Sequence, residues 1–228
     1  MHYRIGTRGS KLALVQSEYV KRRMEEAYPE DTFELVIIKT TGDKVTDKPL
    51  AAIGTKGLFV KEIEEELLSG SIDMAVHSMK DMPAECATGL TFAKAWKRED
   101  CRDVLILKTA GSFSELPSGA VIGTGSLRRA CQLAMLRPDI QFTAIRGNVD
   151  TRINKLMDDS YGLDGIVLAA AGLNRLGRSS EITEYLDPNK FLPAPAQGVL
   201  YIQCRENDEE IKNILKSIHN EEIAKVVA

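Results

Sequence analysis

The sequence has few of the residues on which metal centres and disulfide-rich folds depend. Its 228 residues include four cysteines and three histidines. The cysteines lie far apart, without a C-x-x-C pair, and the histidines show no ligand spacing. We therefore expect no metal site and no disulfide framework, and interpret the cysteines as buried, reduced thiols. The residues concerned are Cys86, Cys101, Cys131, Cys204, His2, His77 and His219.

Long apolar runs and an excess of positive charge are also missing. The longest apolar stretch, near residues 166–173, is too short to span a bilayer, and Arg4, Arg8 and Lys11 interrupt the N-terminus where a secretory signal needs a continuous apolar core. The 30 Lys and Arg against 33 Asp and Glu give a formal charge of -3, which argues against a nucleic-acid binder with a basic face. We expect a cytoplasmic monomer without membrane or nucleic-acid partners.

What remains is an ordinary globular composition arranged as an internal repeat. Hydrophobic residues make up 43% and charged residues 28% of the chain, whose length suits one large domain or two lobes. A strand at 3–5, a G-T-R-G-S turn at 6–10 and a helix match a strand at 121–122, a G-T-G-S turn at 123–126 and a helix.

Two further pairs follow in the same order. The strand at 33–38 matches 140–145, and the helix and strand ending at residue 76 match those ending at residue 167. Chance likeness among βα units is the alternative, because such units are common in α/β proteins. We predict an α/β fold of two similar lobes with a ligand cleft between them.

Two segments are candidate crossings between the lobes. One is the charged run at 97–103, and the other is the proline-rich run at 191–198. The expected lobes are therefore residues 1–97 plus 197–228 and residues 98–196.

Residues 73–83, reading D-M-A-V-H-S-M-K-D-M-P, place polar groups where an apolar strand ends. Ligands bind beyond the carboxyl ends of strands in open α/β sheets, so His77, Ser78, Lys80 and Asp81 are candidate site residues. A solvated turn is the alternative. The segment from Gly42 to about Gly57 has little periodicity and is either a lid or an ordered surface excursion.

Arginines provide the second chemical signal. Arg128 and Arg129 begin a helix directly after a glycine turn, where a cation is unfavourable unless an anion is bound. Arg146 and Arg152 follow the next strand, and Arg8 lies at the matching turn of the first lobe. Guanidinium groups suit carboxylates and phosphates, although solvated or salt-bridged arginines are the alternative.

No nucleotide motif accompanies these arginines. Residues 54–57 lack the Walker A spacing, and residues 123–125 lack the third glycine of a dinucleotide fingerprint. The pattern therefore predicts a binder of small polyanions, with polycarboxylates preferred. Asp81, a carboxylate among cations, would stabilise a cationic intermediate or transfer a proton.

Taken together, these segments resemble the hydroxymethylbilane synthase (porphobilinogen deaminase) family over essentially the whole chain. They are residues 8–16, G-L-F-V-K-E at 57–62, A-V-H-S-M-K-D at 75–81, residues 123–132, R-G-N at 146–148, A-G-L and R-L-G at 171–177, and Gln197-Gly198. The resemblance implies a transferase of tetrapyrrole and haem biosynthesis that joins four porphobilinogen molecules and releases ammonia. It also implies two lobes like those of type II periplasmic binding proteins, with two hinge crossings.

The resemblance assigns roles to particular residues. Asp81 is implied as the catalytic residue, facing the pyrrole nitrogens, and residues 42–56 as the lid. The acetate and propionate groups of the growing chain would be held by the arginines and their neighbours. The binding residues are Arg8, Ser10, Lys56, Ser78, Lys80, Thr124, Ser126, Arg128, Arg129, Arg146, Arg152, Gln197 and Gly198.

The sequence departs from the family at its C-terminus. Family members continue into a third small α+β domain whose cysteine, in a Gly-Gly-Cys setting, carries the dipyrromethane cofactor. This chain ends where that domain begins, and none of its cysteines has that setting. We therefore expect no covalently bound cofactor, which calls full turnover into question. Gly125, Ala196 and Gln203 replace a frequent serine, glycine and glutamate.

Two other functions compete with this one. A non-catalytic two-lobed binding module for pyrrole carboxylates or other small polyanions is the main alternative. A nucleic-acid binder comes third, and salt-dependent retention on DNA would identify it.

Overall fold

A computed structural model describes residues 1–44, 60–93, 98–222 and 225. The described residues form two compact units. Unit 1 contains residues 1–44, 60–93, 98–99 and the chain from residue 198 onward, and unit 2 contains residues 100–197. The main chain crosses between them at 99–100 and 197–198, one or two residues from the boundaries expected from the sequence.

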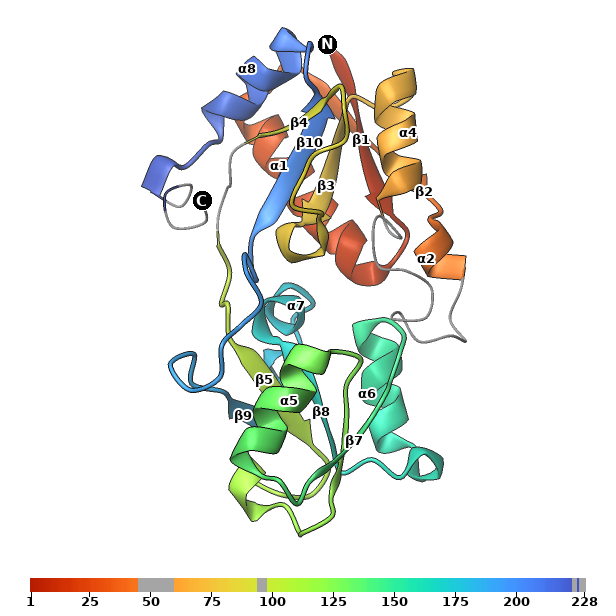
Figure 1. The fold of residues 1–228 in the computed structure, drawn as a ribbon. Helices are drawn as coiled ribbons and strands as arrows, with labels where there is room; N and C mark the ends of the chain where they lie inside the picture. The colour runs from red at the N-terminus through yellow and green to blue at the C-terminus, as the bar shows by residue number, and fades with distance from the viewer. Residues whose placement is uncertain (45–59, 94–97, 223–224, 226–228) are drawn as a thin grey trace. The chain divides into compact units, whose positions relative to one another are not determined.

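Unit 1 is built on a five-stranded sheet in the order β2-β1-β3-β10-β4. Strand β1 is parallel to β2 and β3, whereas β10 is antiparallel to β3 and β4. The strands are β1 His2–Arg8, β2 Thr32–Ile38, β3 Met74–Ser78, β4 Leu90–Ala93 and β10 Leu200–Arg205. The helices are α1 Lys11–Ala27, α2 Thr41–Lys44, α4 Lys61–Ser69, the 3-10 turn η1 Met79–Asp81 and α8 Glu209–Ser217 (Figure 1).

Unit 2 has a second five-stranded sheet in the order β7-β6-β8-β5-β9. Strand β6 is parallel to β7 and β8, and β5 is antiparallel to β8 and β9. The strands are β5 Asp103–Leu107, β6 Val121–Gly123, β7 Gln141–Thr143, β8 Gly165–Ala169 and β9 Glu184–Tyr185. The helices are α5 Leu127–Leu136, α6 Val149–Met157, α7 Ala170–Arg175 and the 3-10 turns η2 Phe113–Glu115, η3 Asp159–Tyr161 and η4 Ser179–Glu181.

The two sheets share one topology, which confirms the predicted repeat. Strands β1, β2 and β3 correspond to β6, β7 and β8 in order and direction. The sequence pattern did not predict the counterpart of β10. The fourth strand of each sheet, β10 or β5, begins within a few residues of a crossing, so each unit is completed by chain arriving from the other.

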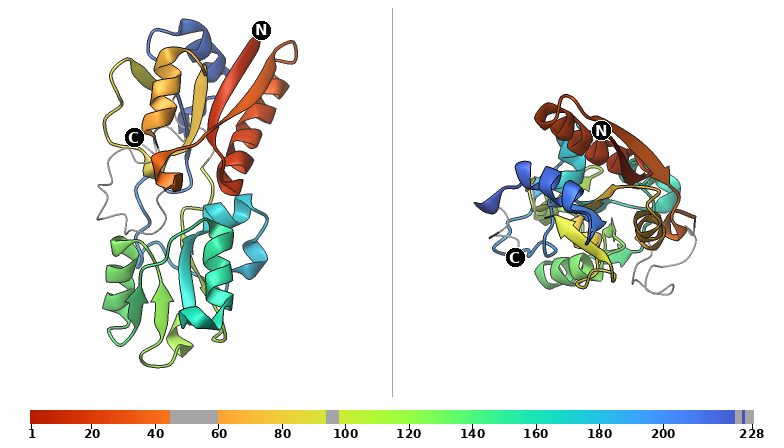
Figure 2. Two further views of the ribbon diagram at one scale, coloured as in Figure 1. Left: turned by 90° about the vertical axis from the view of Figure 1, so that its right-hand side faces the viewer. Right: turned by 90° about the horizontal axis from the view of Figure 1, so that it is seen from above.

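Helices cover both faces of each sheet (Figures 1 and 2). In unit 1, α1 and α8 pack on the face that carries Ile5 and Met74, while α4 packs on the face that carries Ala75. In unit 2, α5 packs on one face and α6 and α7 on the other. Successive side chains of β3 and β8 point to opposite faces of their sheets, and both faces are buried. Each unit therefore has two apolar layers, one on each side of its sheet.

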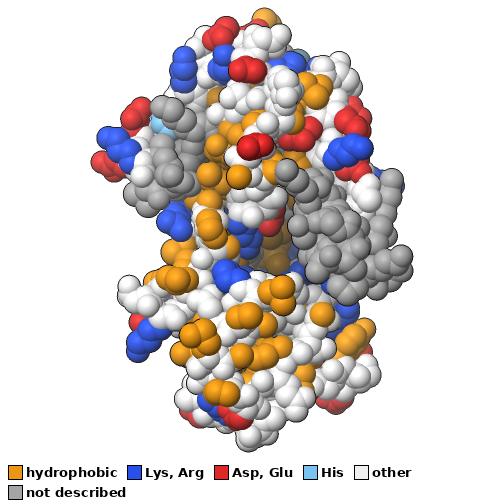
Figure 3. Space-filling model, in the orientation of Figure 1, with side chains coloured by type: hydrophobic (Ala, Val, Ile, Leu, Met, Phe, Trp, Pro, Cys, Tyr) orange, Lys and Arg blue, Asp and Glu red, His pale blue; other side chains and the backbone are white. Residues whose placement is uncertain are grey.

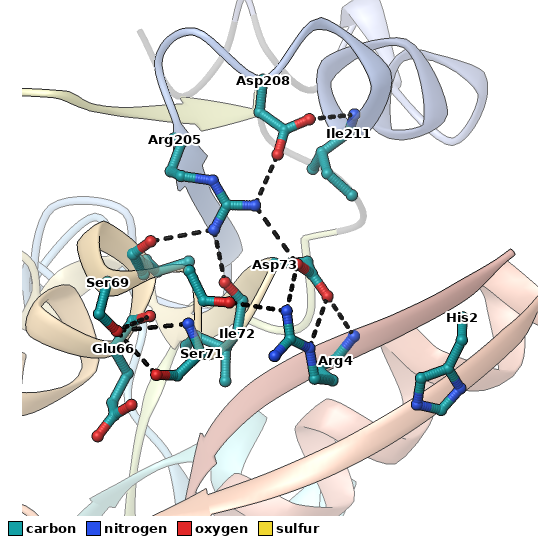
Figure 4. Close-up of polar contacts among 12 residues, drawn as sticks. His2, Arg4, Glu66, Ser69, Ser71, Ile72, Asp73, Arg205, Asp208 and Ile211 are labelled. Atoms are coloured by element: carbon teal, nitrogen blue, oxygen red, sulfur yellow. Dashed lines mark hydrogen bonds and ion pairs between the residues drawn. The ribbon is translucent and has the colours of Figure 1, made fainter.

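A charged network joins β10 and the start of α8 to the rest of unit 1 (Figure 4). Asp73, the residue before β3, accepts hydrogen bonds from the Arg4 guanidinium at 3.0 and 3.1 Å, and its Oδ1 lies 3.4 Å from Arg205 Nη2. Arg205 also donates to Asp208 Oδ2 at 2.7 Å and to the Ile72 carbonyl at 2.7 Å. This network joins β1, β3, β10 and the start of α8, elements that are distant in sequence.

Several local expectations need correction. Only Cys204 among the cysteines is buried; Cys131 is exposed on α5, and all four are free thiols. Thr41–Lys44 is a short helix, whereas little periodicity was expected from Gly42 onward. Leu127, Met135 and Leu136 expose apolar side chains on α5, and apolar side chains gather on this face of unit 2 (Figure 3). Within the described ranges, no helix is long and apolar enough to cross a membrane.

Candidate functional site

In unit 1, the predicted polar cluster lies where β3 ends. Ser78 is the last residue of the strand, and η1 then carries Lys80 and Asp81, both exposed. Ser78 Oγ accepts a hydrogen bond at 3.2 Å from Nε2 of Gln16, a buried residue of α1. Gln16 therefore orients Ser78, a role that nothing in the sequence pattern indicated.

His77 differs from its neighbours. It lies inside β3, only 7% exposed, rather than among the exposed polar groups as the sequence suggested. Its Nε2 lies 3.1 Å from Oε1 of Gln203 on the adjacent strand β10. Burial, more than the nearby charge of Arg8, lowers the pKa of His77 to about 4, so the ring is neutral near pH 7.

The two glycine turns that follow β1 and β6 are built alike. Ser10 caps α1 by accepting from the Ala13 amide at 3.3 Å, and Ser126 caps α5 by accepting from the Arg129 amide at 3.5 Å. A capping serine uses oxygen lone pairs, so its hydroxyl proton stays available to an anion at the helix N-terminus. Thr124 is buried, and its Oγ1 accepts from the Ser126 amide at 3.1 Å.

Arg128 and Arg129, at the start of α5, both meet the carboxylate of Asp103. Arg129 donates to Asp103 Oδ1 from Nε at 2.9 Å and from Nη2 at 2.7 Å, and Arg128 Nη1 lies 2.7 Å from Oδ2. Asp103 is fully buried at the start of β5. Burial alone would raise the pKa of Asp103, but the charges of Arg129 and Arg128 outweigh it, so the pKa lies below its ordinary value.

The other two predicted arginines of unit 2, Arg146 and Arg152, border the turn between β7 and α6. Arg152 Nε donates to the Gly147 carbonyl at 2.8 Å, and Lys155 Nζ donates to the Arg146 carbonyl at 3.2 Å. Gly147 itself has a positive φ of 114°. The R-G-N sequence is therefore a turn whose carbonyls accept hydrogen bonds from two cationic side chains of α6.

Gln197 and Gly198 lie at the second crossing. Gln197 is 1% exposed, and its Nε2 donates to the Cys101 carbonyl at 2.7 Å and to Asp103 Oδ1 at 3.1 Å. Both contacts are made within unit 2. Of the other predicted residues, Arg8 ends β1, while Lys56 and most of the 42–56 segment lie outside the described residues.

The predicted residues therefore divide between the units. Arg8, Ser10, Ser78, Lys80, Asp81 and Gly198 belong to unit 1, whereas Thr124, Ser126, Gln197 and the other four arginines belong to unit 2. Each set supplies cations and hydroxyl donors beyond the carboxyl ends of parallel strands, where a small anion can bind. Their convergence on one ligand stays a prediction. Among the described residues, no group of three His, Cys, Asp or Glu could hold a metal ion.

Solved structures share this fold. The methionine binding protein MetQ aligns with 98% of this chain and 92% of its own, with a TM-score of 0.55 at 14% identity. A putative lipoprotein from Actinomyces odontolyticus aligns with 99% of this chain and 93% of its own, with a TM-score of 0.57 at 14% identity. The chain thus has an α/β fold of the type II periplasmic-binding-protein class, as expected.

Sequence comparison identifies the family. The family model described as "Porphobilinogen deaminase, dipyromethane cofactor binding domain" matches residues 3–213. The porphobilinogen deaminase of Lachnospira eligens is 89% identical over 97% of this chain and 75% of its own length. Those of Fusobacterium nucleatum and Clostridioides difficile are 56% and 52% identical, over 98% and 97% of this chain and 74% and 73% of their own length. This chain belongs to the porphobilinogen deaminase family.

The family carries a dipyrromethane cofactor, and the donor set of this chain fits such a group. Dipyrromethane bears several carboxylates, which require cations and hydroxyl donors. Arg128, with 27% of its side chain exposed, lies beside the Ser126 cap at the N-terminus of α5. That combination of a guanidinium and a hydroxyl at a helix N-terminus is suited to a carboxylate.

Proposed function

We propose that the chain is a hydroxymethylbilane synthase, a transferase of tetrapyrrole and haem biosynthesis. It would condense four porphobilinogen molecules into hydroxymethylbilane and release one ammonia at each condensation. The observation that carries the proposal is the family match over residues 3–213, because it includes every described arginine and carboxylate of the candidate site.

The cationic residues of the site would bind the carboxylates of the ligand. Arg8, Arg128, Arg146 and Arg152 would bind the acetate and propionate groups of substrate and growing chain, with help from hydroxyl, ammonium, amide and backbone donors. These helpers are Ser10, Ser78, Thr124, Ser126, Lys80, Gln197 and Gly198. Lys56 and residues 42–56 are included from the family likeness alone. Arginine suits this task since its planar fork pairs with a carboxylate through two hydrogen bonds.

Asp81 would be the catalytic residue. Loss of ammonia breaks the aminomethyl C–N bond of porphobilinogen and leaves a positively charged azafulvene-like carbon, which the free α-carbon at the end of the growing chain attacks before losing its proton. A carboxylate on exposed η1 can stabilise that positive charge and transfer protons at the pyrrole nitrogens and the leaving amine.

We propose that none of the chain's four cysteines carries the cofactor covalently. When bound, dipyrromethane supplies the primer on which pyrrole units are assembled. Cys204 is buried, which raises its pKa to about 11, and burial also raises the pKa of Cys86, so neither is an effective nucleophile. Intact-mass measurement after incubation with porphobilinogen should show no added mass on these thiols. A pyrrole adduct mapped to any of them would contradict this.

The formal net charge of -3 supports our proposal of a cytoplasmic monomer without nucleic-acid or membrane partners. Light scattering on the purified chain tests whether it is a monomer, and retention on DNA at low salt, which we do not expect, tests for a nucleic-acid partner.

The decisive experiment is porphobilinogen consumption by Asp81→Asn, with oxidation of the product to a fluorescent porphyrin. We expect a fall of about 10²- to 10⁴-fold in rate, as is usual when a proton-transfer group is removed. Glu85→Gln is the matched control, because it neutralises another exposed carboxylate four residues away. Equal rates for Asp81→Asn and the unaltered chain would remove Asp81 from catalysis.

Calorimetry separates the enzyme from the binding-module alternative. A chain that binds porphobilinogen but neither consumes it nor responds to Asp81→Asn would be a binding protein. A chain that neither binds nor consumes porphobilinogen would have no role in this chemistry.

A further inference from the structure

Lys155 is a cation of unit 2 that neither the sequence motifs nor the family likeness assigns to the site. It lies in the last turn of α6, half-buried, and its Nζ donates to the Arg146 carbonyl at 3.2 Å. The ammonium also lies 5.4 Å from the centre of the Tyr161 ring, within the range of a cation–π contact. A backbone carbonyl and an aromatic ring therefore hold this charge.

The position of Lys155 on α6 explains its reach. Side chains of a helix lean toward its N-terminus, and residues three apart lie on the same side. Lys155 therefore lies on the same side of α6 as Arg152, and both side chains extend back to the turn that precedes the helix. Arg152 Nε donates to the Gly147 carbonyl at 2.8 Å. Two consecutive carbonyls of the turn thus accept hydrogen bonds from two cations of one helix face.

Gly147 makes these two hydrogen bonds important. Its φ is 114°, and glycine adopts many other backbone conformations at little cost. The two carbonyls belong to the peptide groups on either side of Gly147, so hydrogen bonds to both restrict rotation of the glycine. Arg146 depends on this directly, because the carbonyl that Lys155 holds is its own. Hydrogen bonds from charged donors are also stronger than those between neutral groups.

We propose that Lys155 is a positioning residue, which holds the backbone of Arg146 so that this arginine can bind a ligand carboxylate. The Lys155 ammonium itself does not bind the ligand. The inference rests on the proposed function for the chemical class of the ligand, a polycarboxylate. A lysine that binds the ligand directly and a lysine that only stabilises α6 are the two alternatives, and each predicts a different outcome.

A double-mutant cycle between Lys155 and Arg146 tests the assignment. In calorimetry with porphobilinogen, we expect Lys155→Met to bind about 3- to 10-fold more weakly than the unaltered chain, and Arg146→Gln about 10- to 100-fold more weakly. The double variant should bind within about twofold of Arg146→Gln, because a lysine that acts through Arg146 has no effect once that guanidinium is gone. A salt concentration of about 0.5 M screens the more distant effect of the charge that Lys155→Met also removes.

Two further variants serve as controls. Lys155→Arg keeps a cationic donor on the same helix face and should bind within about threefold of the unaltered chain. Lys212→Met is the matched control, because Lys212 Nζ of α8 also donates to a carbonyl that precedes its helix, that of Glu206, at 2.8 Å. Helix α8 follows the end of β10 that pairs with the start of β3, away from Ser78, so Lys212→Met should leave binding unchanged.

Several results would overturn the proposal. Additive losses in the cycle would show that Lys155 contacts the ligand itself. Equal binding by Lys155→Met and the unaltered chain would leave Lys155 with no role beyond the stability of α6. Equal weakening by Lys155→Met and Lys212→Met would show a general effect of positive charge, and no recovery of binding in Lys155→Arg would exclude a role as donor.

Backbone NMR tests the positioning without any ligand. Amide order parameters at residues 146–148 should be about 0.85 in the unaltered chain and in Lys212→Met, and should fall toward about 0.6 in Lys155→Met. Unchanged order parameters in Lys155→Met would overturn the positioning role. If porphobilinogen is neither bound nor consumed, the proposed function fails, and the order parameters still decide whether Lys155 holds the turn.

Tyr161→Leu takes the place of Lys155→Met if that variant does not fold. It removes the ring contact and so loosens the ammonium, and it should weaken binding about two- to threefold. The loss should again disappear when Arg146→Gln is present. A loss that persists in the Arg146→Gln background would overturn the proposal.

Discussion

His77 Nε2 lies 3.1 Å from Gln203 Oε1 between neighbouring antiparallel strands of the unit 1 sheet. Gln203 Nε2 in turn donates to Glu64 Oε1 at 2.8 Å, so the amide links the imidazole to a carboxylate of α4. A neutral amide provides an acceptor for the ring N–H without supplying the negative charge that would stabilise an imidazolium.

His77 should therefore stay neutral down to about pH 4. Its folded-state pKa lies below the unfolded value of about 6.5, so stability is fully present above that pH and falls as the pH drops toward 4. The maximum loss from this group is about 3 kcal/mol. NMR titration of the ring protons measures the pKa, and His77→Gln assigns the signal and should flatten this part of the pH profile. Titration near pH 6.5 would contradict the prediction.

Asp73→Asn should weaken the charged network that joins β10 and the start of α8 to the rest of unit 1. Burial alone would raise the pKa of Asp73, but hydrogen bonds from Arg4 and Arg205 lower it overall. The stability it contributes is present above about pH 4 and is lost as the pH falls through the lowered pKa. We expect the free energy of unfolding, measured with urea, to fall by about 2 kcal/mol at pH 7. The variant should also lose less stability than the unaltered chain as the pH is lowered further. Asp159→Asn, which neutralises a carboxylate 94% exposed, should cost less than about 0.5 kcal/mol. Equal losses for the two would show that the network is not stabilising.

Gly147→Ala should destabilise unit 2 by more than about 2 kcal/mol. The residue has φ 114°, and a Cβ there would lie 2.6 Å from Thr151 Cγ2 and 2.8 Å from Thr151 Cβ. Gly162→Ala is the matched control, because φ is 58° and nothing lies within 4 Å of the added carbon, so about 1 kcal/mol is expected. The turn also carries Arg146 and accepts from Arg152, so porphobilinogen affinity should fall for Gly147→Ala alone. Similar unfolding energies for both variants would refute the clash.

Ala196→Gly should leave stability unchanged or raise it by up to about 1 kcal/mol. Ala196, next to the second crossing, has φ 56°, the one positive φ among the described non-glycine residues. Glycine relieves the left-handed strain but adds freedom to the unfolded chain, and the two effects oppose each other. Ala194→Gly, two residues earlier and without a positive φ, gains no such relief and should lose about 0.5–1 kcal/mol. Thermal unfolding of both variants gives the sign, and a clear loss for Ala196→Gly would contradict the strain.

The predictability of the fold follows from the range of the interactions involved. The paired I-G-T turns and their capping serines were visible because a strand, a glycine turn and a helix N-terminus use consecutive residues. The counterpart of β10 in unit 2 was not, since β5 pairs with β8 about 60 residues later through backbone hydrogen bonds that side chains do not encode. His77 was misplaced for a related reason: its burial depends on Gln203, which is 126 residues away.

The sequence alone determined the family, the repeated α/β units and the supply of cations and hydroxyls for a polycarboxylate, because these depend on residue types in consecutive motifs. Only the tertiary structure distinguished Arg128 from Arg129. Both follow the same turn, and what separates them is the buried carboxylate of Asp103 on a strand that enters from the crossing. Buried ion pairs depend on which charges share a low-dielectric interior, and that is decided by packing between distant segments rather than by neighbours in the chain.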